Sequence, residues 1–156
     1  MNDIFQTVRQ NEVKVYSKLI EQININIINE DGQNLLHKAI SHHNTLLGLD
    51  LISRNIDVNT RDKNGQTPLH YAAAHGNLEI AEAIIKAGGN PNIKDIHLNN
   101  ALGTAAFNAR GKYKIVELYK KAGGDAQSKN KANRSSLDFA RQINDEILIA
   151  VLEMNA

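Results

Sequence analysis

The chain has 156 residues and lacks both cysteine and tryptophan. Without cysteine the protein can form no disulfide, no thiolate metal site and no cysteine nucleophile. Aromatic residues amount to only 4% of the chain, so cores built from large rings are not expected. No apolar run approaches the roughly 20 residues that a membrane-spanning helix requires. We therefore expect no membrane partner.

The chain also has no large excess of one charge, because 18 lysines and arginines face 17 acidic residues and the formal net charge is +1. This balance argues against broad electrostatic attraction to nucleic acid. The first residues show no basic segment followed by an apolar one, so no secretion signal is visible. We expect a cytoplasmic, monomeric protein that forms one domain over residues 1–156. Delivery by a specialised secretion system and self-association into an oligomer are left open.

A phrase that recurs along the chain carries most of the information. Its fullest copy begins with Thr67, Pro68, Leu69 and His70 and continues through Gly76. Leu36 and His37 precede Leu69 and His70 by 33 residues, and Gly32 precedes Gly65 by the same distance. A fixed period near this length is typical of stacked helical units.

The phrase resembles the ankyrin repeat family, with the closest match over residues 62–94. Weaker copies cover 29–61 and 95–129, and we assign capping units to 1–28 and 130–156. The resemblance implies an all-α solenoid of about four to five units with projecting turns or hairpins. It also implies a protein–protein interaction module without enzymatic activity or cofactor, acting as an inhibitor, an immunity factor or a scaffold.

The residues themselves predict the same architecture. Four good N-cap residues stand at equivalent positions, namely Asn34, Thr67, Asn100 and Ser135. Gly76 and Gly111 are expected to end first helices, and second helices are expected over 78–87 and 113–122. Asn55, Gly88 and Gly123 then end second helices in a left-handed conformation, and His43 takes the place of Gly76 in the preceding unit.

Histidines offer the main alternative function. His37 and His70 share one place in the phrase, where the resemblance implies hydrogen bonds to the turn backbone. His42 and His75 are 33 residues apart, and His43 adjoins them, so a three-histidine zinc site or an enzyme built on it is the competing hypothesis. Because no carboxylate lies at a matching place, we interpret these histidines as contact surface and expect no metal. No other catalytic arrangement is visible.

The resemblance implies that partners dock on the turn tips and the exposed side of the first helices. Carried over by position, it gives the following partner-binding residues: Asp31, Gln33, His42, Lys63, Asn64, Gln66, Tyr71, His75, His97, Phe107, Asn108 and Arg110. Aromatic and arginine side chains usually contribute most to binding. For Tyr71 and Phe107, packing between repeats is an equal alternative.

The copy at 95–129 departs from the pattern in two ways. Leu69 to Ile80 spans 11 residues, but the equivalent interval from Leu102 to Ile115 spans 13, so two residues are inserted near Asn108. Insertions in repeat proteins map to loops and often to binding faces, which predicts that this segment shapes the partner-binding groove. Gly103 also replaces the histidine of the phrase, which leaves its hydrogen bonding open.

A basic segment overlaps the insertion. Between residues 110 and 134 there are eight lysines and arginines against two acidic residues. This segment is either the solvated outer face of a helix with its turns or a docking patch for an acidic partner.

Overall fold

The computed structural model describes residues 3–155. Within this range it contains ten α-helices, one short 3-10 helix, η1 (Ile20–Gln22), and no strand. The α-helices are α1 (Ile4–Arg9), α2 (Val13–Leu19), α3 (Leu35–Ser41), α4 (Thr45–Ser53), α5 (Pro68–His75), α6 (Leu78–Lys86), α7 (Ala101–Asn108), α8 (Lys114–Lys121), α9 (Ser136–Gln142) and α10 (Glu146–Glu153). The predicted all-α solenoid is confirmed. No helix in the described range is long and apolar enough to cross a bilayer.

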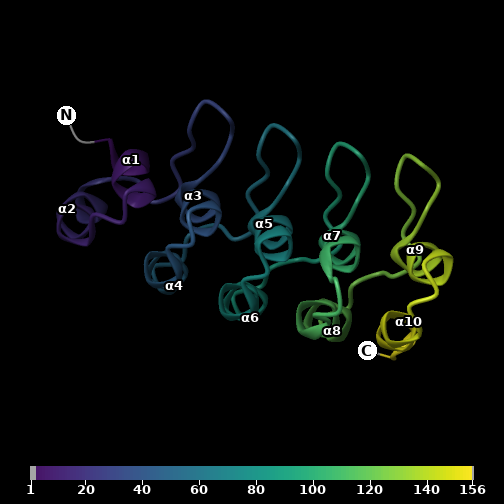
Figure 1. Ribbon diagram of the computed structural model, residues 1–156. Coiled ribbons are helices and arrows are strands. Elements are labelled where there is room, and N and C mark those ends of the chain that lie inside the picture. Colours follow the sequence, from purple (N-terminus) through teal and green to yellow (C-terminus); the bar gives the residue numbers. More distant parts are fainter. Residues whose placement is uncertain (1–2, 156) are drawn as a thin grey trace.

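The helices form two rows, as Figure 1 shows. The first helices of successive pairs, α3, α5, α7 and α9, lie one after another, and the second helices, α4, α6, α8 and α10, form the other row. A hairpin precedes each of α3, α5, α7 and α9, and all the hairpins project to the same side. Because successive pairs follow one another along the stack, the two chain ends lie at its opposite ends.

Capping residues fix where the first helices begin. The Asn34 side-chain oxygen accepts hydrogen bonds from the backbone N–H groups of Leu36 and His37, and Asn100 and Ser135 cap their helices in the same way. Thr67 occupies the N-cap position before Pro68, whose missing N–H needs no partner at the first helical position. The side-chain caps at Asn34, Asn100 and Ser135 each satisfy orphan amides at a helix start and contribute about 1 kcal/mol.

Left-handed residues fix where the helices end. His43, Asn55, Gly76, Gly88 and Gly123 all have positive φ, between 58° and 90°, as the sequence predicts. The second helices are slightly shorter than expected, at Leu78–Lys86 and Lys114–Lys121, because the terminal residues serve as caps.

One predicted helix end is wrong. Helix α7 ends at Asn108 rather than at Gly111, and two consecutive left-handed residues, Arg110 (φ 44°) and Gly111 (φ 82°), follow it. The two inserted residues thus extend the loop between α7 and α8 instead of lengthening α7.

The core lies between the two rows and between neighbouring pairs. The leucines of the phrase, Leu36, Leu69, Leu102 and Leu137, are all buried. Alanines on the first helices, such as Ala72 and Ala105, are also buried. Small side chains at these places let adjacent helices approach closely, so each pair is covered only by its neighbours.

Candidate functional site

Each hairpin tip is built by one Asp or Asn side chain. In the hairpin at 62–66, the Asp62 Oδ1 atom accepts hydrogen bonds from the N–H groups of Asn64 (2.9 Å) and Gln66 (2.8 Å). Asn29, Asp95 and Asn130 make the equivalent pairs of bonds in the other hairpins. The tips are thus closed by local bonds of the kind that Asx turns use.

Neighbouring hairpins are joined through their backbones. The carbonyl oxygens of Asp31, Asn64 and His97 accept hydrogen bonds from the N–H groups of Lys63 (2.8 Å), Ile96 (2.9 Å) and Lys131 (2.9 Å). The side chains of Asp31, Lys63, Asn64 and His97, all predicted partner-binding residues, are exposed. Because the backbone supplies the structural bonds, these side chains are available for recognition.

Tyr71 connects a hairpin to the first helices. Its hydroxyl donates to Asp62 Oδ2 (2.8 Å) and accepts from Gln33 Nε2 (2.7 Å), and its ring packs edge-on against His37 with 4.9 Å between centroids. Burial and the Asp62 hydrogen bond raise the pKa of Tyr71 to about 12, so the phenol stays neutral. The ring is half-buried, and it both packs between repeats and reaches the surface.

Phe107 behaves similarly at the other end of the stack. Its ring is half-buried and lies edge-on to Phe139, with 4.9 Å between centroids, and the Arg134 guanidinium lies 5.9 Å from the Phe139 ring. Phe107 therefore joins α7 to α9, a contact that the sequence left open.

The three histidines of the competing hypothesis do not converge. His43 and His75 lie edge-on with 5.3 Å between ring centroids, but His42 Nδ1 faces the Lys38 carbonyl (3.1 Å) on its own helix. Partial burial, with smaller contributions from His43 and His42, lowers the pKa of His75. Among residues 3–155 no three His, Asp or Glu side chains are placed to hold a metal ion. The zinc hypothesis therefore gains no support.

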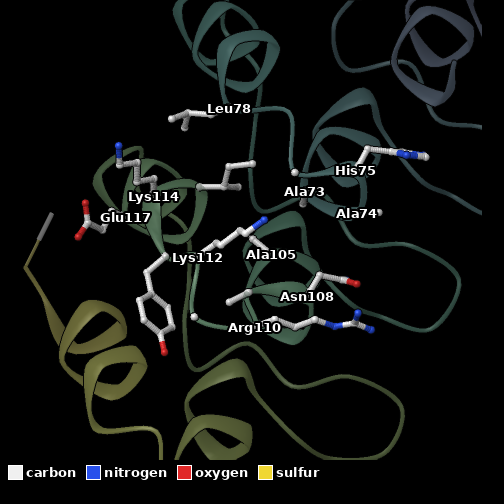
Figure 2. Close-up of a pocket in the computed structure, with 15 residues that line it drawn as sticks. Ala73, Ala74, His75, Leu78, Ala105, Asn108, Arg110, Lys112, Lys114 and Glu117 are labelled. Carbon is white, nitrogen blue, oxygen red and sulfur yellow. The ribbon is translucent and has the colours of Figure 1, made fainter. Parts of the chain in front are cut away.

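The inserted segment borders a pocket between α5 and α7 with a volume of about 790 Å³. Figure 2 shows the C-terminal end of α5 on one side, with Ala73, Ala74 and His75, and the α7–α8 segment on the other. Three predicted partner-binding residues line this pocket, namely His75, Asn108 and Arg110. The hairpins join the opposite, N-terminal ends of these helices, so the pocket and the hairpin tips are separate features.

The structure also brings forward surface residues that lie outside the predicted partner-binding set. Leu98 lies at the third hairpin tip with φ 63°, where Gly32, Gly65 and Asn133 stand in the other hairpins. Leu98 and Ile96 are 42% and 43% exposed, which gives this tip an apolar surface. The 33-residue spacing from Gly65 to Leu98 was the signal that could have identified it. The sequence placed Lys112 and Lys114 in the basic segment, but only the structure shows that both line the pocket.

Comparison with known families agrees with this architecture. The family model described as ankyrin repeats (3 copies) matches residues 4–95 and 47–133. A comparison with curated proteins finds none that matches the chain.

Proposed function

Because the chain belongs to the ankyrin repeat family, whose members generally act as protein–protein interaction modules and typically lack enzymatic activity, we propose that it binds a partner protein through one particular surface. We name this surface the inner face and define it as the hairpins 29–33, 62–66, 95–99 and 130–134 with helices α3, α5, α7 and α9. Binding would inhibit, neutralise or scaffold the partner.

One observation carries the proposal. At equivalent tip positions, Asp31, Asn64 and His97 use their backbone carbonyls to join the next hairpin, while their side chains are exposed. A row of exposed side chains on backbones that hydrogen bonds already hold in place suits recognition, because little backbone conformational entropy is lost when the partner binds. Gln33 and Gln66 end the first two hairpins, and Tyr71 and Phe107 lie on α5 and α7 of the inner face; all four are partly exposed.

The test is affinity capture from the native cell with the full chain as bait. A triple variant of the tips, Lys63→Ala, Asn64→Ala and His97→Ala, should lose the captured protein or bind it at least tenfold more weakly. The matched control changes three exposed residues of the second helices, Glu82→Ala, Lys86→Ala and Lys121→Ala, and should retain it. Equal capture by both triple variants would show that the inner face is not the binding surface.

A further inference from the structure

The strongest unassigned feature is the pocket between α5 and α7. Its walls come from two repeats, and much of its lining is apolar, with Ala73, Ala105 and Ala109 buried beneath and Leu78 and Ile115 beside them. A volume of about 790 Å³ lies within the range of pockets that hold drug-sized ligands. The pocket can therefore accommodate apolar side chains of a short segment.

The pocket depends on the two-residue insertion. Between α5 and α6 only Gly76 and Asn77 intervene, whereas residues 109–113 separate α7 from α8. The left-handed Arg110 and Gly111 turn this longer loop, and the Lys112 N–H closes it on the Ala109 carbonyl at 2.7 Å. The loop supplies one wall of the pocket.

Cations dominate the charged groups at this pocket. Arg110, Lys112 and Lys114 are exposed, line the pocket and make no ion pair with any residue between 3 and 155. Glu117 is the one acidic residue in the lining. In Figure 2 the Lys112 side chain extends toward Ala105 and Ala73, while the side chains of Arg110 and Asn108 extend away from Lys112. An ammonium above an apolar surface favours a ligand that combines a carboxylate with an apolar side chain.

We propose that this pocket binds a short acidic segment of the partner protein, in which apolar side chains enter between α5 and α7 and an adjacent carboxylate pairs with Lys112. This inference rests on the proposed function, since it assigns the chemistry of one part of the partner. It differs from binding at the hairpin tips, which join the other ends of the same helices.

The test uses ¹⁵N-labelled full-length protein and three synthetic peptides: GSDLDLGS, its lysine counterpart GSKLKLGS and its alanine counterpart GSDADAGS. We expect saturable amide shift changes for GSDLDLGS that gather around the pocket, at Ala74, Ala105 and Gly111. The lysine and alanine peptides should bind at least tenfold more weakly. Absence of saturable shifts, equal binding of the three peptides, or shifts confined to the hairpin tips would overturn the proposal.

Variants separate the pocket from general attraction by positive charge. Lys112→Glu should weaken binding of GSDLDLGS at least tenfold, and Ala74→Trp, which fills the pocket without changing its charge, should do the same. Lys121→Glu makes the same charge change at the C-terminal end of α8, outside both the pocket lining and the inner face, and should alter the affinity less than twofold. Equal effects of the two lysine variants would contradict a pocket. Circular dichroism confirms that each variant is folded.

These peptide measurements need no native partner, so the two proposals fail in different ways. If the tip triple variant loses the captured protein but GSDLDLGS does not bind, only the pocket proposal is wrong. If GSDLDLGS binds at the pocket but the tip variant and its control capture the protein equally, only the inner-face proposal is wrong.

Discussion

The His70 Nε2 atom lies 3.1 Å from the backbone carbonyl oxygen of Asn99, in the hairpin of the next repeat. On the other side of the ring, Nδ1 accepts a hydrogen bond from the Thr67 N–H at 3.1 Å. Because a backbone N–H can only donate, Nδ1 must be unprotonated and Nε2 must carry the proton. One neutral imidazole therefore joins a helix start to the neighbouring hairpin, and His37 does the same with Asn34 and Gln66.

Replacing this histidine should destabilise the stack. His70→Ala removes both hydrogen bonds and leaves the Thr67 N–H and the Asn99 carbonyl without this partner. We expect the free energy of unfolding to fall by roughly 2 kcal/mol or more, measured by urea denaturation followed by circular dichroism. His97→Ala, at an exposed hairpin position, is the control and should change it by less than about 0.5 kcal/mol. A similar loss for both variants would contradict the assigned role.

The same histidines should make stability depend on pH. Burial lowers the pKa of His37 from 6.5 to about 4, and it also lowers that of His70. As the pH falls below 6.5, these histidines therefore become protonated in the unfolded chain while they stay neutral in the folded protein. The contribution of His37 to the free energy of unfolding is therefore fully present above pH 6.5. As the pH falls from 6.5 toward 4, the free energy of unfolding decreases by about 1.4 kcal/mol per pH unit.

Urea unfolding at pH 7.5, 5.5 and 4.5 checks this prediction. His37→Asn removes the titrating group, so its stability should fall less steeply with decreasing pH than that of the unmodified protein. Identical slopes for the two proteins would assign the pH dependence to other groups.

Two left-handed glycines should differ in how well they tolerate a methyl group. A Cβ at Gly65 (φ 71°) would lie 3.1 Å from the Asp95 Cα in the next hairpin, whereas a Cβ at Gly76 (φ 67°) would meet no atom within 4 Å. Gly76→Ala should cost about 1 kcal/mol from the backbone conformation alone. Gly65→Ala should cost more, since adjacent hairpins must also separate. If thermal unfolding shows equal losses of stability for the two variants, the adjacent hairpins can separate without measurable cost, which would contradict the prediction.

Leu98 should contribute to binding more than to stability. A leucine with φ 63° is strained relative to the glycine or asparagine of the other hairpins. Leu98→Asn relieves that strain, so the free energy of unfolding should stay unchanged or rise by up to about 1 kcal/mol. The affinity for the captured partner should fall, because the exposed apolar side chain is removed. A loss of stability above about 1 kcal/mol would instead show that Leu98 packs structurally.

Local chemistry explains why so much could be predicted from the sequence. The cap at Asn34, the left-handed His43 and Asn55, and the buried Leu69 each follow from residue type and a 33-residue period. Such features depend on a few adjacent residues, which the sequence displays directly. The misplaced end of α7 shows the limit, because an insertion can lengthen either a helix or a loop.

The directions of side chains and the distances between neighbouring repeats could be determined only from the tertiary structure. The sequence placed His42, His43 and His75 together, but the rotamer of His42 turns its Nδ1 toward Lys38. Likewise, the sequence revealed two extra residues and a run of lysines, but not a pocket. A pocket exists only where the α7–α8 loop meets the end of α5, and that distance is set by helix packing between repeats rather than by either segment alone.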